Sequence, residues 1–180
     1  MARRSRAARR YAEAAFELAE RDAAFDAWAS GLGVAAAGVS DPRVGTFLDS
    51  PAVPLPDRLG VMERMLAGRA PDGVVRLAKL LVRRRVADRL APIATEFQRL
   101  LNDRRGIVEA LVTSAAALTP EETTALRTKI EQMTHRTVTL RVQVDVALIG
   151  GLTVRVGDTL YDASVRGRLE RLRAQLIAAR

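Results

Sequence analysis

Three sets of residues in this sequence are of types that do chemistry: a single histidine, two aspartates near the C-terminus and glycines in short clusters. His135 has neither a second histidine nor a cysteine to join it, which excludes a histidine-pair metal site and a cysteine–histidine nucleophile pair. Asp158 and Asp162 are the nearest approach to a carboxylate pair, but each also suits a turn or a helix N-terminus. We therefore expect no catalytic residue, no bound metal and no cofactor.

The glycine clusters raise the question of a phosphate-binding loop. The segment "GLGVAAAG" resembles a dinucleotide-binding fingerprint, but its third glycine is misplaced and no strand is expected before it. Gly150 and Gly151 lie between two expected strands, whereas phosphate-binding loops lead from a strand into a helix N-terminus. We predict structural turn roles for four residues: Gly150, Gly151, Asp158 and Asp162.

Composition limits the classes of partner. A net charge of +8 favours nucleic acid, anionic lipid or acidic protein surfaces. Aromatic residues make up only 4%, which leaves few side chains on which bases could stack. The absence of cysteine excludes disulfides and thiolate metal sites, and no apolar run approaches the roughly 20 residues of a membrane span. The arginine-rich start "MARRSRAARR" shares features with transit peptides, but the helical pattern continues from it without a break.

The first hundred or so residues have the apolar spacing of helices. Leucine, valine and alanine recur every three or four residues between proline and glycine breaks, which predicts helices with short connections. The expected helices number about six. Their approximate ranges are Arg4–Glu20, a second from a cap at Asp22 to a point before Ser40, a third from Asp41, Asp57–Ala67, Asp72–Arg85 and Asp88–Arg104.

The last third changes period and predicts a small sheet. A strand is expected in "GIVEALVTSA", a helix begins at Thr119 with a capping box to Glu122, and strict alternation over 137–146 predicts a strand with one buried face. A further strand and a final helix follow. We expect an antiparallel sheet covered on one side, with these residues of the final helix buried: Val165, Leu169, Leu172 and Leu176. The predicted fold is mainly α, with an N-terminal six-helix bundle (1–105) and a small C-terminal α+β domain (106–180).

The fifth helix has more apolar surface than an outer helix of a bundle needs. Over Val74 to Val82 the apolar positions cover an arc of about 220°, where little over 100° suffices. Either this helix is central, or one of its sides takes a partner helix. The first helix adds alanines at helical spacing beside Tyr11, which permit close helix approach, either inside the bundle or to a partner.

Four segments, spread in order along the chain, resemble one family. They are "RRYAEAAFELA", "LLVRRR", "VTSAAALTPEE" and "LIGGLTVRVGDTLYDASVRGRLERL". Together they are similar to the delta subunit of bacterial and chloroplast F-type ATP synthase, whose mitochondrial counterpart is the oligomycin-sensitivity-conferring protein. The last segment is the most specific of the four.

The resemblance implies a non-catalytic stator subunit. In this family the helical domain holds the N-termini of the α subunits, and the C-terminal domain joins the b subunits of the peripheral stalk. The α3β3 head of the enzyme is thereby kept from turning with the rotor, so that proton-driven rotation is coupled to ATP synthesis. The expected location is peripheral, at the cytoplasmic face of a bacterial plasma membrane. Carried over to this chain, the α segment lies on the first and fifth helices, at Tyr11, Ala15, Val74, Leu77, Ala78 and Leu81.

The alternative is a small basic nucleic-acid- or ribosome-associated protein. It accounts for the pI of about 11.1 but not for the apolar excess of the fifth helix. It predicts binding that collapses as salt rises, because phosphate contacts release counterions. The stator hypothesis predicts tight binding through apolar anchors, with modest salt dependence and no nucleic-acid partner.

Overall fold

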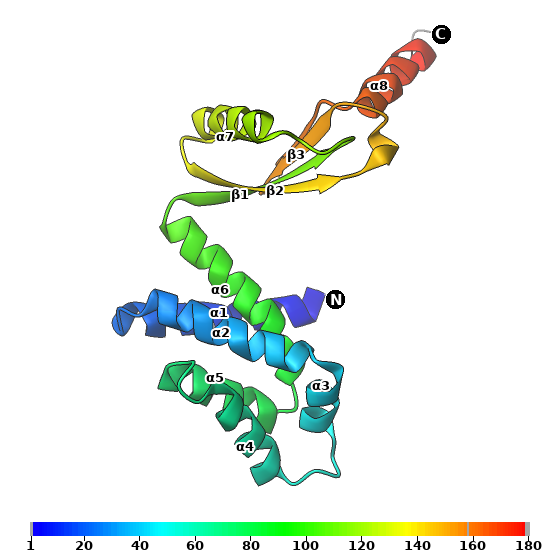
Figure 1. The fold of residues 1–180 in the computed structure, drawn as a ribbon. Coiled ribbons are helices and arrows are strands. Elements are labelled where there is room, and N and C mark those ends of the chain that lie inside the picture. Colours follow the sequence, from blue (N-terminus) through cyan, green and yellow to red (C-terminus); the bar gives the residue numbers. More distant parts are fainter. Residues whose placement is uncertain (1, 158, 179–180) are drawn as a thin grey trace. The chain divides into compact units, whose positions relative to one another are not determined.

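The computed structural model describes residues 2–157 and 159–178, and this part of the chain is mainly helical with one four-stranded sheet (Figure 1). The α-helices are α1 (Ala2–Arg21), α2 (Phe25–Ser40), α3 (Pro42–Asp49), α4 (Leu55–Leu66), α5 (Asp72–Arg83), α6 (Leu90–Arg104), α7 (Pro120–Thr134) and α8 (Val165–Ala178). The strands are β1 (Ile107–Ser114), β2 (Thr137–Val144), β3 (Leu152–Val156) and β4 (Thr159–Asp162). Two short 3-10 helices are η1 (Ala87–Arg89) and η2 (Val146–Leu148). The prediction of a mainly α chain with a small sheet is confirmed.

The chain divides into two compact units, Met1–Leu101 and Asn102–Arg180. Each unit has an apolar core of its own. The first contains α1 to α5 and most of α6, and the second contains the sheet, α7 and α8. No helix among the described residues is both long enough and apolar enough to cross a membrane.

Aromatic rings lie in the core of the N-terminal unit. Phe16 of α1 lies 5.0 Å from Phe25 of α2 and 5.6 Å from Phe97 of α6, between ring centroids. The indole of Trp28 stacks on Phe97 with the centroids 6.5 Å apart. Helix α1 adds a buried row of small side chains, which lets its neighbours approach closely: Ala8, Ala12, Ala15 and Ala19.

Two of the predicted helix starts are confirmed by their caps. Asp41 accepts a hydrogen bond from the Arg43 amide at 2.8 Å, with a proline at the first helical position of α3. Thr119 and Glu122 form the expected capping box of α7, with N···O distances of 2.8 and 3.2 Å. The prediction that Asp22 caps the second helix was wrong, because α2 begins at Phe25 without a side-chain cap.

The sheet is mixed, which corrects the expectation of an antiparallel one. Its order is β2-β1-β3-β4; β1 pairs with β2 in parallel, and the other two pairs are antiparallel. The parallel pair follows from chain order, because α7 lies between β1 and β2 and supplies the crossover that parallel strands require. Figure 1 shows α7 over the part of the sheet where β2 begins.

Fewer apolar residues of the C-terminal unit are buried than the sequence pattern predicted. Val138 at the start of β2 is 3% exposed, but Val142 is 40% and Val144 55% exposed. The strand lies at the edge of the sheet and runs on beyond α7, so its far end lacks a covering layer (Figure 1). The expected burial of the apolar residues of the final helix was also wrong, since Val165, Leu169, Leu172 and Leu176 are all exposed.

Candidate functional site

Helix α5 has a buried stripe and an exposed apolar side. Its stripe, which lies in the core, consists of Val74, Ala78, Leu81 and Val82. At about 100° per residue, Leu77, Leu80 and Arg84 follow one another on one side of this stripe. Leu80 is 38% exposed, and Leu77 is partly exposed. On the opposite side Lys79 reaches Glu63 of α4 at 3.3 Å, so that side is held against a neighbouring helix.

Helix α1 presents a matching side beside α5. Tyr11 and Leu18 lie on one side of its buried alanine row, and Leu18 is 38% exposed. The guanidinium of Arg84 donates a hydrogen bond to the Tyr11 hydroxyl at 3.1 Å, which joins this side of α1 to the exposed side of α5. We call these residues the α1/α5 flank: Tyr11, Leu18, Leu77 and Leu80.

The structure separates the six residues expected to bind a partner into two groups. Ala15, Val74, Ala78 and Leu81 are buried and hold α1 and α5 in the core, so they form no surface. Tyr11 and Leu77 are partly exposed and belong to the α1/α5 flank. The explanation that α5 is central therefore accounts for most of the apolar arc, and one edge of the arc faces outward.

Sequence reasoning missed Leu18 and Leu80 as surface residues. Both belong to the apolar arcs of their helices, and the apolar spacing gives no indication of which edge of an arc is covered. One available signal was the position of Arg84. A charged residue one turn after Leu80 marks the side of α5 that reaches solvent.

The double glycine contacts the beginning of α8. Gly151 has φ +76°, and a Cβ on it would lie 2.6 Å from the Ala163 carbonyl oxygen and 3.1 Å from the Ser164 Cα. The Val165 amide donates a hydrogen bond to the Gly150 carbonyl at 2.9 Å. The two glycines thus lie between η2 and β3 and also let the backbone before α8 pass close by. We call this contact the glycine junction.

Asp162 and Ser164 complete the start of α8. The Asp162 carboxylate accepts hydrogen bonds from the Ser164 amide at 2.9 Å and the Ser164 hydroxyl at 2.7 Å. The Ser164 oxygen in turn accepts from the Gly167 amide at 3.0 Å. The hydrogen bonds from Ser164, with a smaller contribution from the Arg171 charge, lower the pKa of Asp162. Asp158, the other aspartate expected in a turn, lies outside the described residues.

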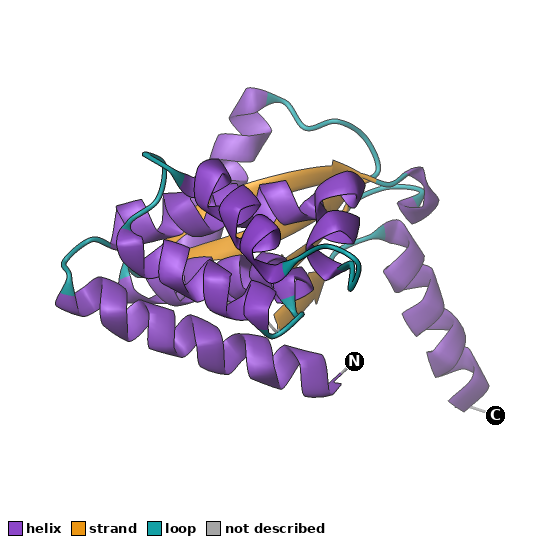
Figure 2. Cartoon of the chain, turned by 90° about the horizontal axis from the view of Figure 1, so that it is seen from below, coloured by secondary structure: helices purple, strands orange, loops and turns teal. Residues whose placement is uncertain are grey.

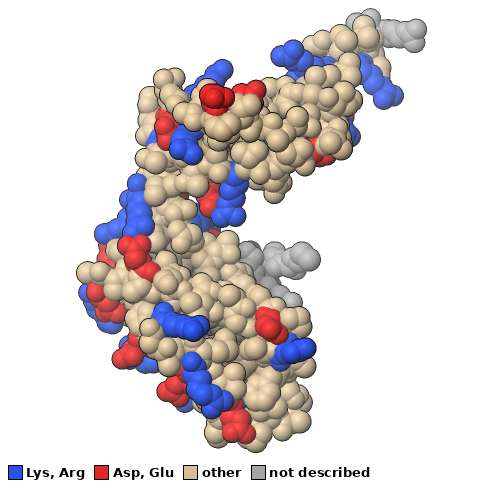
Figure 3. All heavy atoms as spheres, viewed as in Figure 1, with Lys and Arg blue, Asp and Glu red and all other residues tan. Residues whose placement is uncertain are grey.

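Beyond its first turn, α8 extends away from the sheet (Figure 1, Figure 2). Its apolar side chains are exposed. Leu169 is 54% and Leu172 53% exposed, and arginines stand out around the same helix in Figure 3. A shallow hollow on its surface is lined by Leu169, Leu172, Arg173, Leu176 and Ile177. This is a second candidate partner surface, separate from the α1/α5 flank.

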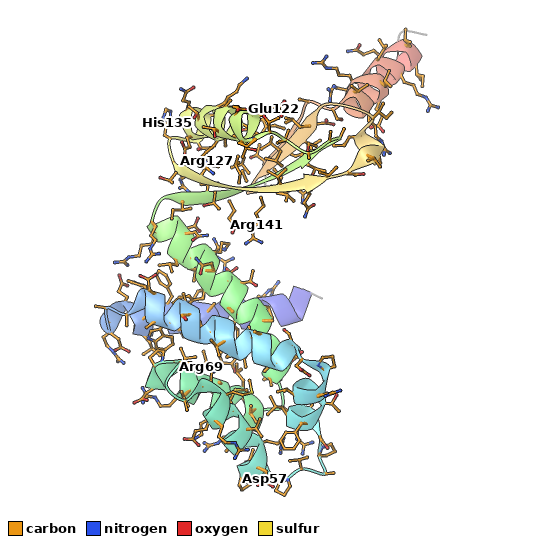
Figure 4. All side chains as sticks on the ribbon, viewed as in Figure 1. Asp57, Arg69, Glu122, Arg127, His135 and Arg141 are labelled. Carbon is orange, nitrogen blue, oxygen red and sulfur yellow. The ribbon has the colours of Figure 1, made fainter. Side chains whose placement is uncertain are left out.

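The residue types that could do chemistry are not brought together. His135 has φ +54° in the left-handed turn that ends α7, and Figure 4 places it and Glu122 toward opposite ends of that helix. Arg141, also labelled in Figure 4, pairs with Glu109 across the sheet at 3.0 Å. Within the described ranges, no three histidine or acidic side chains are grouped to hold a metal ion.

Comparison with known proteins finds a family model, curated relatives and a solved structure that all belong to ATP synthases. A family model described as "ATP synthase delta (OSCP) subunit" matches residues 7–176. ATP synthase subunit delta of Heliobacterium modesticaldum is 38% identical over 171 residues, covering 94% of this chain and 92% of that protein. The subunit delta of Thioalkalivibrio sulfidiphilus is 36% identical over 169 residues, covering 94% and 95%. A chain in the cryo-EM structure of the Toxoplasma gondii mitochondrial ATP synthase hexamer shares the fold, with a TM-score of 0.75 at 22% identity, covering 94% and 97%.

These matches span nearly the whole chain and confirm the resemblance found in the sequence. The chain belongs to the ATP synthase delta (OSCP) subunit family, whose members are non-catalytic stator components of the ATP synthase.

Proposed function

We propose that the N-terminal unit holds the N-terminal segment of an ATP synthase α subunit on the α1/α5 flank. The flank offers apolar side chains from two adjacent helices and a hydrogen-bonding pair, Tyr11 and Arg84, between them. An amphipathic helix docks in such a place by burying its own apolar side. The exposure of two large apolar side chains, Leu18 and Leu80 at 38% each, on adjacent sides of α1 and α5 is the observation that carries this proposal.

The C-terminal unit, in this proposal, joins the b subunits of the peripheral stalk. The six helices α1 to α6 act as one bundle that binds the head. Residues 106–180 act as the domain that binds the stalk. The protein is then peripheral, at the cytoplasmic face of a bacterial plasma membrane, and it is held there only through the complex. The division is supported by the two separate apolar cores.

A stator joint requires long-lived contact more than chemistry. Burying apolar surface contributes about 25 cal/mol per Å², and ordering a flexible terminus offsets a large part of that gain. We therefore expect affinity to come from a few apolar anchors on the flank. Screening by salt weakens interactions between exposed charges and leaves apolar burial largely intact.

The test is a titration of the full chain with a peptide of the host's α-subunit N-terminus. Trp28 packs against Gly73 at the beginning of α5, so its fluorescence reports on that helix, and calorimetry covers binding that leaves the fluorescence unchanged. We expect submicromolar binding that persists in high salt, with a scrambled peptide as control. If calorimetry detects no binding at any salt concentration, the proposed head contact is wrong.

A further inference from the structure

The exposed leucines of α8 follow the spacing of a helix-pairing seam. Val165, Leu169, Leu172 and Leu176 are separated by four, three and four residues, which is the a/d pattern of two helices packed side by side. Their exposed fractions are 40, 54, 53 and 66%. We call these four residues the α8 seam. At about 100° per residue they fall within a narrow strip, and Ile177 lies to one side of it.

Arginines border the α8 seam. The helix contains four arginines and one glutamate. Arg166 pairs with Glu170 at 3.1 Å, and Arg171 lies 3.9 Å from the Asp162 carboxylate. Arg168 and Arg173 have no ion-pair partner within the part of the chain that the structure describes. In the heptad that the seam defines, these two occupy g and e, the positions from which side chains pair across to a second helix.

The charge pattern decides among possible occupants. A second copy of α8 would bring its own arginines against Arg168 and Arg173, so self-pairing is disfavoured by repulsion. Helices that lie on anionic membranes have a broad apolar face, often with aromatic residues, whereas the seam is narrow and α8 has none. Nucleic acid would leave the leucines of the seam unburied. An acidic amphipathic helix would bury the leucines of the seam and also pair its carboxylates with the two arginines.

We propose that the α8 seam pairs with an amphipathic partner helix whose apolar residues also repeat every three and four positions and are bordered by glutamate or aspartate. This inference rests on the proposed function, because such a helix would belong to the stalk. The apolar side of the partner helix contacts Leu169, Leu172 and Leu176. Its bordering carboxylates pair with Arg168 and Arg173.

The start of α8 suits a helix that bears load. The glycine junction and the bond from the Val165 amide to Gly150 attach its first turn to the loop before β3. The Ala163 amide also donates to the Leu152 carbonyl of β3 at 3.1 Å. Force on a helix paired with the seam therefore reaches β3 and the loop before it through these two backbone hydrogen bonds.

The experiment uses the full chain and two designed helical peptides of about three heptads each. Both have leucine at the a and d positions; one has glutamate and the other lysine at e and g. The variants are Leu172→Ser, the double variant Arg168→Glu with Arg173→Glu, and a control with Arg127→Glu and Lys129→Glu. The control makes the same charge change on exposed positions of α7. Circular dichroism checks that each variant is folded.

We expect the unmodified chain and the α7 control to bind the glutamate peptide about tenfold more tightly than the lysine peptide at low salt. The double variant on α8 should reverse this preference. The Leu172→Ser variant should lose binding of both peptides. Equal binding of the two peptides, absence of binding, or a preference that the α8 double variant leaves unchanged would overturn the inference. So would capture of α8 by vesicles of phosphatidylcholine and phosphatidylglycerol in competition with the glutamate peptide.

Titration with the α-subunit peptide, run on the same preparation, separates this inference from the proposed function. If the α peptide binds and neither designed helix does, only the pairing of α8 fails. If the glutamate peptide binds with the expected charge preference and the α peptide does not, the head contact fails while the chemistry of the α8 partner stands.

Discussion

At the scale of single residues, Gly151 combines a positive φ with a close contact to the backbone of another segment. Its φ of +76° is one that a side chain disfavours, and a Cβ would lie 2.6 Å from the Ala163 carbonyl oxygen. We predict that Gly151→Ala destabilises the C-terminal unit by about 2–4 kcal/mol, through strain and the displacement of the segment before α8. Hydrogen exchange of the β3 amides in the full chain measures the effect.

Gly157 is the matched control for this substitution. It also has a positive φ, of +57°, but a Cβ there would meet nothing within 4 Å. Gly157→Ala should therefore cost only about 1 kcal/mol, from the backbone conformation alone. If the two variants accelerate β3 exchange equally, the close approach at the glycine junction contributes nothing to stability.

Which single-residue roles could be predicted from sequence depended on how local their contacts are. The caps at Asp41 and Thr119 form within a few residues of the chain, so residue type and order were sufficient to predict them. The contact of Gly151 with Ala163 joins segments that only the folded sheet brings together. The sequence located Gly150 and Gly151 in a loop but contained no sign of which backbone would pass them.

At the scale of elements, the two sides of α5 should respond oppositely to a charge. Leu81 is fully buried, and Leu80, its neighbour in sequence, is 38% exposed on the α1/α5 flank. We predict that Leu81→Asp destabilises the N-terminal unit by about 3–5 kcal/mol, because it places a carboxylate in the apolar core. Leu80→Asp should change stability by less than about 1 kcal/mol and still weaken binding of the α-subunit peptide at least tenfold.

Urea unfolding followed by Trp28 fluorescence gives the stability of both variants, and calorimetry gives the binding. Arg76→Asp is a suitable control for Leu80→Asp, since it places a carboxylate at an exposed position of α5 outside the flank. If Leu80→Asp binds the peptide as well as Arg76→Asp does, the flank is not the docking surface.

Helix periodicity predicted which segments fold but not which sides of them are covered. The apolar arc of α5 and the leucines of α8 have the same kind of spacing, yet one is mostly core and the other is exposed. The parallel pairing of β1 with β2 could have been predicted, because a helix between two strands favours a parallel pair. The alternation of apolar and polar residues alone does not show whether a strand pairs in parallel or antiparallel. The coverage of β2 depends on where α7 ends above the sheet, which no local pattern encodes.

At the scale of the whole molecule, the basic charge sets the background against which specific binding is judged. The net charge is +8, but many arginines are already opposite carboxylates, as in the pairs of Arg9 with Glu13 and of Arg99 with Glu96. Figure 3 shows both signs interspersed over the visible face of the N-terminal unit. Composition alone could not distinguish such a surface from a continuous basic patch, and for that reason it left nucleic acid open as a partner.

Salt dependence separates the two classes of partner. A chain with this charge should bind RNA weakly and without sequence preference at low salt, and that affinity should fall by about a hundredfold or more between 50 and 200 mM salt, because several phosphate contacts release counterions. Binding of the α-subunit peptide should change by less than about threefold over the same range, since apolar burial is little screened. Anisotropy of a labelled RNA and of the labelled peptide, measured in one buffer series, compares them directly. Tight RNA binding that survives the higher salt, together with a peptide that dissociates, would indicate that the basic residues of the chain and not the α1/α5 flank carry the main interaction of this protein.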